Sequence, residues 1–195
     1  MRIIGLTGSI GMGKTTAAGF FRAAGIPVHD ADAAVHRLYG GPAAAAVEAA
    51  FPGTAADGIV DRDRLAEAVL GDPQALKRLE AIIHPLVRQD EQAFLQAAAE
   101  AGAPMVVLEI PLLFETGGDN RCDAVVVVTA KPETQRERVL KRPGMTPERL
   151  NALLVRQTPD AEKRRRAHFL VFTDDDLDCA KRQVIAIIRA LAAAA

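Results

Sequence analysis

The stretch Gly8-Ser9-Ile10-Gly11-Met12-Gly13-Lys14-Thr15 decides the fold of this chain, because it matches the phosphate-loop pattern G-x-x-x-x-G-K-[ST]. The pattern is meaningful only between a strand and a helix. Here the apolar run Ile3–Thr7 precedes it, and a helical pattern from Thr15 to about Ala24 follows, closed by Gly25. The context therefore predicts a strand, a loop and a helix that together bind the phosphates of a nucleotide.

Each part of this loop has a defined chemical task. Its glycines let the backbone curl so that N–H groups point inward at a helix N-terminus, which forms an anion-binding nest. The Lys14 ammonium is expected to reach the β- and γ-phosphates, and the Thr15 hydroxyl to bind Mg²⁺. The predicted nucleotide-binding residues are Gly8, Gly11, Met12, Gly13, Lys14, Thr15 and Thr16.

Composition excludes several classes of protein. The 195 residues are 49% hydrophobic and 25% charged, which is typical of a globular chain and not of a disordered one. A net charge of −1 argues against a generic nucleic-acid binder. We find neither a signal peptide nor an apolar stretch long enough for a membrane span, so a cytoplasmic location is expected. The two cysteines, Cys122 and Cys179, are expected to be reduced thiols rather than zinc ligands.

Short apolar runs alternate with helical patterns along the chain. Besides the first strand, the predicted strands are Pro27–His29, Met105–Ile110, Ala124–Thr129 and Phe169–Phe172. Each is apolar throughout, which is typical of a parallel sheet covered by helices on both faces. The sequence therefore predicts an α/β fold in three layers.

The segment between the second and third predicted strands is mostly helical and too long for one crossover. We interpret it as a helical insertion at the rim of the sheet. Within it, Asp72-Pro73 is a typical helix start, and Pro85 is expected to break or restart a helix after His84. Later helices are expected to start at Pro132, Thr146-Pro147 and Thr158-Pro159, and a last one covers about Leu177–Ala194.

Two aspartates, Asp30 and Asp32, follow the second strand, where an open α/β sheet places its ligands. The helix that begins near Ala33 needs an N-terminal cap, and the pattern leaves open which aspartate supplies it. The functional interpretation is that Asp32 accepts the proton of an acceptor hydroxyl or orients that hydroxyl.

Two glutamates are candidates near the third strand: Glu109 lies close to its end, and Glu115 lies in the loop after it. Glu109 is placed to hold a water on Mg²⁺ or to help fix the acceptor, and its buried charge requires a cationic neighbour. Glu115 is a weaker candidate, expected as a solvated loop carboxylate.

A basic segment follows the fourth strand. Helical spacing places Gln135, Arg138 and Arg142 on one face, where arginines can neutralise charge on a transferring phosphoryl group. The alternative is a solvated helix rich in Arg and Glu. A second basic run, Lys163–Arg166, is expected to be a solvated face.

A phosphate loop indicates a nucleotide and not a particular reaction. A GTPase is disfavoured because no D-x-x-G occurs, and Asn120–Asp123, which resembles a guanine motif, precedes its strand instead of following it. The remaining alternatives are a small-molecule kinase and a nucleotide-binding regulator without transferase activity. Asp32 and the arginine segment favour the kinase, because a sensor needs neither.

Taken together, these motifs show that the chain resembles the dephospho-CoA kinase family from its first strand to its final helix. The opening Gly5–Thr16 is shared by many kinases, whereas Ile83–Val87 (I-H-P-L-V) and Pro111–Glu115 (P-L-L-F-E) are far more specific. Asp30–Asp32 matches the family's D-A-D, and Gln157 follows Gln135, Arg138 and Arg142 in the same order. Ser9 and Met12 replace small residues of the family loop, and Thr173 stands where the family has Asn. A left-handed backbone at Ser9 would be strained.

The resemblance implies phosphorylation of the ribose 3′-hydroxyl of dephospho-CoA by ATP with Mg²⁺, the last step of CoA biosynthesis; another small kinase, such as a nucleoside monophosphate kinase, is the alternative. It implies a P-loop fold like that of nucleoside monophosphate kinases, with a core of about 1–32, 103–130 and 167–195, an acceptor-binding insertion of about 33–102 and a lid of about 131–166. The implied catalytic residues are Asp32, Lys14, Arg138 and Arg142. The implied acceptor-binding residues are Asp32, His84, Arg88, Glu109 and Leu112. No pattern indicates an oligomeric state.

Overall fold

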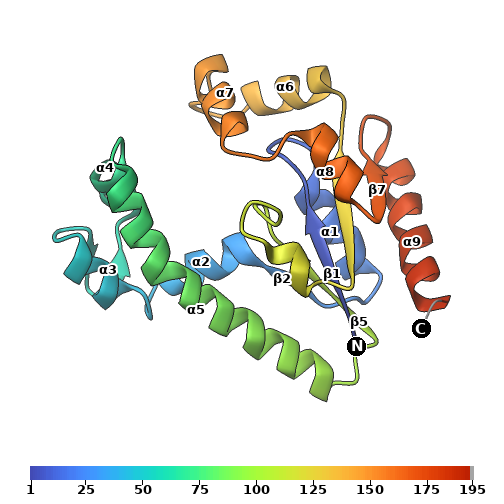
Figure 1. The fold of residues 1–195 in the computed structure, drawn as a ribbon, viewed down its shortest axis with the longest axis horizontal. Coiled ribbons are helices and arrows are strands. Elements are labelled where there is room, and N and C mark those ends of the chain that lie inside the picture. The colour runs from blue at the N-terminus through green and yellow to red at the C-terminus, as the bar shows by residue number, and fades with distance from the viewer. Residues whose placement is uncertain (194–195) are drawn as a thin grey trace. The chain divides into compact units, whose positions relative to one another are not determined.

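The computed structural model describes residues 1–193 and is built around a five-stranded sheet with the strand order β2-β5-β1-β6-β7 (Figure 1). The strand β1 pairs in parallel with both β5 and β6, and β6 pairs in parallel with β7. The predicted strands are confirmed to within one or two residues: β1 is Arg2–Thr7, β2 Val28–Asp30, β5 Met105–Glu109, β6 Ala124–Thr129 and β7 Phe169–Phe172.

Both faces of this sheet are buried, as the apolar strands predict. On one face, Ile4, Leu6 and Val126 form a core with the helices α1, Lys14–Ala23, and α9, Leu177–Ala193. Residues that alternate with these along the strands, such as Val106, Leu108, Val125 and Val127, are equally buried. The α/β class in three layers is therefore confirmed, and the predicted last helix is observed up to Ala193, since residue 194 lies outside the described chain.

The chain forms two compact units, each with its own core. Unit 1 contains Met1–His29 and the chain from Ala98 onward, and unit 2 contains Asp30–Ala97. Unit 2 holds α2 (Ala31–Tyr39), α3 (Ala44–Ala50), β3 (Ala55–Ala56), β4 (Ile59–Val60), α4 (Arg62–Val69) and most of α5 (Pro73–Glu100). Its core includes Val47, Phe51, Leu65, Leu79 and Ile83.

The short hairpin β3–β4 in unit 2 was not predicted from the sequence. Its two-residue strands are too short to give an alternating pattern. The carboxylate of Glu48 closes the turn before it by accepting from the amides of Gly53, at 2.7 Å, and Ala55, at 2.6 Å. These hydrogen bonds hold the pKa of Glu48 below its usual value.

The prediction that Pro85 breaks the helix is wrong, because α5 continues through it from Pro73 to Glu100. A proline costs one hydrogen bond inside a helix, but Ile83 and Leu86 on either side pack into the core of unit 2 and keep the helix on its course. The start is as predicted, since the Asp72 carboxylate accepts from the amides of Gln74 and Ala75.

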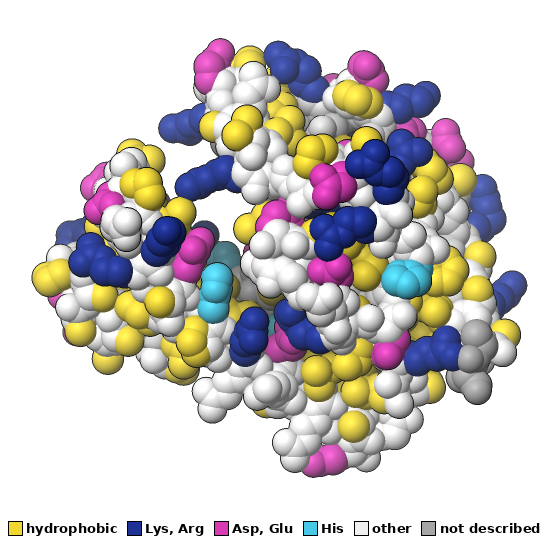
Figure 2. Space-filling view, in the orientation of Figure 1, with side chains coloured by type: hydrophobic (Ala, Val, Ile, Leu, Met, Phe, Trp, Pro, Cys, Tyr) yellow, Lys and Arg dark blue, Asp and Glu magenta, His cyan; other side chains and the backbone are white. Residues whose placement is uncertain are grey.

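Three short helices lie between β6 and β7 in unit 1, and each starts where a proline or capping residue predicts. They are α6 (Pro132–Leu140), α7 (Pro147–Val155) and α8 (Asp160–Arg166), and a 3₁₀ turn, η1 (Gly118–Arg121), precedes β6. Within residues 1–193 the structure contains no helix with the length and apolar character that a bilayer crossing needs. Figure 2 shows Lys and Arg side chains interspersed with Asp and Glu, in keeping with the net charge of −1.

Candidate active site

The loop between β1 and α1 depends on glycine at Gly11. Its backbone is left-handed, with φ of 78°, and an added Cβ would lie 2.5 Å from Cγ2 of Val139 on α6. Ser9, by contrast, is not among the positive-φ residues of the described chain, so its backbone is not left-handed and carries no such strain.

The backbone of the loop is held by side chains from three other segments. The Ile10 carbonyl accepts from the Gln135 amide at 2.7 Å, and the Ile10 N–H donates to the Gln157 amide oxygen at 3.1 Å. The Met12 carbonyl accepts from the Thr173 hydroxyl at 2.9 Å. Both polar groups of Ile10 are thus held by glutamines, Gln135 on α6 and Gln157 just after α7, which makes the loop a preorganised element.

Several amides of the loop, in contrast, donate to no acceptor within residues 1–193. These N–H groups belong to Gly11, Gly13, Lys14, Thr15 and Thr16, at and just before the start of α1. A cluster of unpaired donors at a helix N-terminus is a strong anion site. Met12 differs from the other predicted loop residues, because its N–H donates to the Ser9 carbonyl and its buried Sδ accepts from the Ala130 amide.

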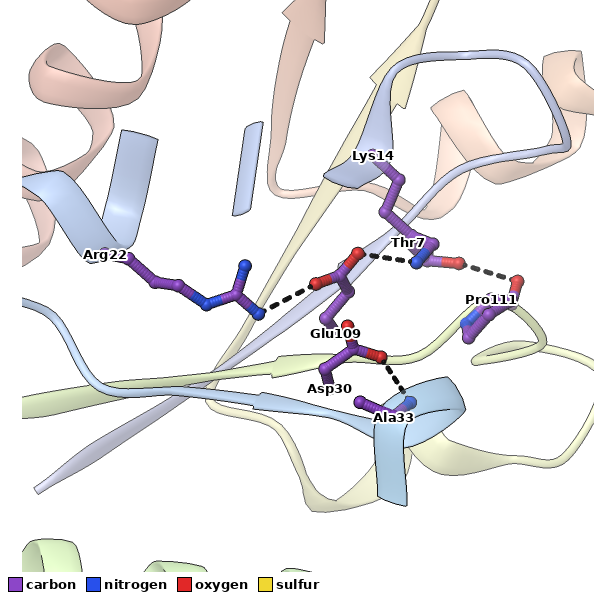
Figure 3. A network of polar contacts seen from close by, with 7 residues as sticks. All are labelled: Thr7, Lys14, Arg22, Asp30, Ala33, Glu109 and Pro111. Carbon is purple, nitrogen blue, oxygen red and sulfur yellow. Dashed lines mark hydrogen bonds and ion pairs between the residues drawn. The ribbon is translucent and has the colours of Figure 1, made fainter. Parts of the chain in front are cut away.

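Glu109, at the end of β5, has the cationic neighbours that its burial requires. Its side chain is 1% exposed, and its carboxylate accepts from Lys14 Nζ at 2.8 Å and from Arg22 Nη2 at 3.3 Å (Figure 3). Both oxygens are therefore engaged by α1, on which Lys14 and Arg22 lie. The predicted need for a cation is confirmed, whereas no local pattern indicated Arg22 as the second partner.

The neighbouring strand ends complete this edge of unit 1. The Thr7 hydroxyl, at the end of β1, donates to the Pro111 carbonyl at 3.1 Å, which fixes the start of the segment after β5 (Figure 3). Leu112 is exposed immediately beyond it, and Thr15 is exposed in the first turn of α1. No group of three or more His, Cys, Asp or Glu side chains within the described chain could hold a metal ion.

The structure resolves which aspartate caps the helix after β2. Asp30 Oδ1 accepts from the Ala33 amide at 3.0 Å and is the cap of α2 (Figure 3). Asp32 is exposed in the first turn of α2, and the capping task does not involve it. His84 and Arg88 are exposed on α5 of unit 2, one turn apart.

The two predicted arginines of the basic segment have different environments. Arg138, on α6, donates to the Thr173 hydroxyl at 2.9 Å and to the Thr173 carbonyl at 2.5 Å. Because the same hydroxyl donates to the Met12 carbonyl, Arg138 is tied to the phosphate loop through one residue. Arg142 lies beyond the end of α6 and is exposed.

The expectations for Glu115 and for Lys163 are wrong. Glu115 is not a solvated carboxylate, since its side chain is 15% exposed and its Oε1 lies 3.1 Å from Nζ of Lys163. Lys163 is fully buried, whereas Arg164, Arg165 and Arg166 of the same run are exposed. Burial raises the pKa of Glu115, but the hydrogen bond from the Thr158 amide and the charge of Lys163 outweigh it and hold the pKa below its usual value.

Within unit 1, the structure therefore brings together the phosphate loop, Lys14, Glu109, Arg138 and Thr173. The predicted residues Asp32, His84 and Arg88 belong to unit 2. Glu115 and Lys163 join the site through contacts that no local pattern signals, and only the family resemblance indicated Gln157.

The sheet order, the phosphate loop and the lysine at the start of α1 define the class of the protein as a P-loop kinase fold. A solved dephospho-CoA kinase from Campylobacter jejuni shares this fold with a TM-score of 0.70, at 23% identity over 97% of each chain. A solved protein from Thermus thermophilus, TT1252, is similar with a TM-score of 0.84, at 37% identity over 97% of each chain.

The sequence comparison narrows this class to one family. The family model described as dephospho-CoA kinase matches residues 2–178. A dephospho-CoA kinase from Mesorhizobium japonicum is 62% identical over 96% of this chain and 95% of its own length. The chain belongs to the dephospho-CoA kinase family.

Proposed function

We propose that this chain transfers the γ-phosphoryl group of ATP to the 3′-hydroxyl of the ribose of dephospho-CoA, which yields CoA and ADP and completes CoA biosynthesis. The observation that carries the proposal is the phosphate loop, whose unpaired amides and Lys14 suit a nucleoside triphosphate. Membership of the family supplies the identity of the acceptor.

Binding of the triphosphate requires Lys14 to exchange its partner. Its ammonium contacts Glu109 Oε1, and the β- and γ-phosphates compete with that carboxylate for it. Glu109 keeps Arg22 as a counter-charge when Lys14 turns to the phosphates, so the exchange leaves no isolated buried charge. Before the nucleotide binds, Glu109 thus holds the Lys14 side chain beside the loop, and afterwards it remains available to orient the acceptor.

Mg²⁺, when bound, neutralises charge on the β- and γ-phosphate oxygens. The Thr15 hydroxyl suits it, because this residue is exposed next to the unpaired amides, and Mg²⁺ needs only one or two protein ligands beside phosphates and waters. Once Lys14 turns to the phosphates, Glu109 Oε2 keeps Arg22, and Oε1 is free to hold a water on Mg²⁺ or to orient the acceptor.

The reacting proton is assigned to Asp32. As the 3′-oxygen of the acceptor forms its bond to the γ-phosphorus, the bond from that phosphorus to the bridging oxygen of ADP breaks, and Asp32 accepts the hydroxyl proton. This assignment is supported by the capping role of Asp30, which removes the alternative task from Asp32. Arg138 and Arg142 are assigned to the charge that develops on the transferring group.

The acceptor and the lid are assigned to separate parts of the chain. The helical insertion of about 33–102 binds dephospho-CoA, and exposed His84 and Arg88, spaced by four residues on α5, suit its anionic groups. The region of about 131–166 forms the lid, whose helices join the loop through Gln135 and Gln157.

A coupled assay of purified protein with ATP, Mg²⁺ and dephospho-CoA tests the function. We expect ADP and CoA in equal amounts, and no turnover with CMP, AMP or shikimate. Turnover of one of these acceptors in place of dephospho-CoA would show that the acceptor is misassigned. ATP binding without turnover of any acceptor would favour a regulator.

The variant Asp32→Asn tests the base in the same assay. We expect kcat to fall by about 10²–10⁴-fold, with ATP affinity unchanged by calorimetry, because the amide cannot accept the proton. Turnover close to that of the parent would remove Asp32 from this role.

A further inference from the structure

The buried ion pair between Glu115 and Lys163 is not explained by phosphoryl transfer. Lys163 is fully buried on α8, and Glu115 lies in the segment after β5. Nζ of Lys163 has no partner besides this ion pair, and Oε2 of Glu115 has no hydrogen-bond partner, within residues 1–193. Burying two charges with so few compensating bonds stabilises a fold little, so a task other than stability is indicated.

The geometry of Glu115 indicates that task. Its Oε1, which faces Lys163, also accepts from the Thr158 amide at 2.6 Å. Thr158 follows directly on Gln157, whose amide oxygen accepts from Ile10 in the phosphate loop. A continuous series of short contacts thus leads from Lys163 through Glu115 and the backbone at Thr158 to the loop.

The far side of the same segment is also anchored. The Thr129 hydroxyl, at the end of β6, donates to Asp160 Oδ2 at 2.9 Å, and this fixes the first turn of α8. The chain directly after Gln157 therefore has two fixed points, Thr158 at Glu115 and Asp160 at Thr129. Without the contact to Glu115, the backbone before Asp160 loses one of these two restraints, and the Gln157 side chain can withdraw from Ile10.

From these contacts we propose that Glu115 is a positioning residue for nucleotide binding: charged and held by Lys163, it fixes the Thr158 amide and thereby keeps Gln157 on the phosphate loop. Glu115 does not touch the nucleotide in this proposal. It keeps the unpaired amides that follow Ile10 aimed at the phosphates. Preorganised donors of this kind bind an anion better because they need no reordering when it arrives. The proposal rests on the proposed kinase function only where the KM for dephospho-CoA is measured.

Two double variants separate the hydrogen bond from the ion pair. Glu115→Gln with Lys163→Met removes both charges but keeps an oxygen that accepts from Thr158. Glu115→Leu with Lys163→Met removes the charges and the acceptor together. We expect ATP affinity, measured by calorimetry, to fall about tenfold in the Leu variant and to stay within about threefold in the Gln variant. The KM for dephospho-CoA is expected to stay within about twofold in both.

A matched control is available on the same two segments. Arg166 on α8 forms an ion pair with Asp119 of η1 at 2.7 Å, but this pair does not contact Thr158. Asp119→Asn with Arg166→Gln is therefore expected to leave ATP affinity within about twofold of the parent. An equal loss in this control would show that tethering α8, and not the position of Gln157, sets the affinity.

A mutant cycle with Gln157→Ala gives the readout that a purely structural role would not produce. If Glu115 acts through Gln157, adding Gln157→Ala to the Leu variant causes no further loss of ATP affinity. The combined variant then binds ATP as well as the weaker binder of the two variants from which it is built. Additive losses, or a Leu variant that binds ATP as the Gln variant does, would overturn the proposal. Should the Leu variant not fold, Glu115→Ser with Lys163→Met replaces it, because serine is too short to reach Thr158. Calorimetry needs no acceptor, so a failure of the proposed activity would remain distinguishable.

Discussion

Replacing Glu109 by glutamine tests how unit 1 holds Lys14 before the nucleotide arrives. Glutamine is nearly isosteric and keeps one acceptor oxygen, so the change mainly removes a charge. The side chain of Lys14 is only 12% exposed, and without the carboxylate its ammonium lacks a counter-charge at 2.8 Å. Removing one member of a buried pair costs about 3–5 kcal/mol, and we take about 3 because Lys14 keeps some contact with water.

For a chain of this size, that loss lowers Tm by about 6–12 °C. Thermal unfolding of parent and Glu109→Gln, without nucleotide and with saturating ATP and Mg²⁺, measures it. ATP supplies Lys14 with a new counter-charge and no longer has to displace Glu109. The rise in Tm on adding ATP is therefore expected to be larger in the variant than in the parent.

The matched control for this experiment is Arg22→Gln. The Arg22 side chain is 42% exposed, so its ion pair with Glu109 contributes less than about 1 kcal/mol, and Tm is expected to fall by less than about 4 °C. An unchanged Tm in Glu109→Gln without nucleotide would refute the reasoning. So would ATP binding that weakens tenfold, because Glu109 would then be a direct part of the nucleotide site.

Two further predictions follow from the loop and from the buried pair. Gly11→Ala places a methyl group 2.5 Å from Val139 and forces φ of 78° on alanine, so we expect ATP affinity, measured by calorimetry, to fall at least about tenfold. In the control Gly25→Ala the added methyl group meets no atom within 4 Å, and only stability is expected to change. Because the pKa of Glu115 is lower in the folded protein than its usual 4.5, the stability from this group is present above that value and is lost as the pH falls through the lowered pKa. Urea unfolding is therefore expected to show that the parent loses more stability than Glu115→Gln with Lys163→Met between pH 6 and pH 3; parallel losses would contradict this.

Local signals predicted much of the fold and part of the site. The phosphate loop, the helix starts at Asp72 and Thr146, and the need of Glu109 for a cation all depend on a few adjacent residues and on simple physical costs. The loop and the helix starts are fixed within one or two turns, whereas the need of Glu109 for a cation follows from its burial alone and leaves the partner to the fold.

Tertiary packing decided the features that the sequence did not predict. Local preference favours a break at Pro85, but apolar side chains on both sides bury in the same core and carry the helix through. Glu115 and Lys163 are far apart in the sequence, and a glutamate in a loop and a lysine in a basic run each suggest solvent when taken alone. Only the fold shows that they neutralise each other.

The strand order has a consequence for folding during translation. The first strand to emerge, β1, sits between β5 and β6, and its Ile3 amide bonds to Asp123, 120 residues later. At about 5–20 residues per second, translation leaves this apolar segment without its neighbours for roughly 5–20 s. Unit 2 is continuous in the sequence and is complete before β5 is made. We therefore expect the insertion to take shape first, and the nascent N-terminus to be the part that depends on chaperones.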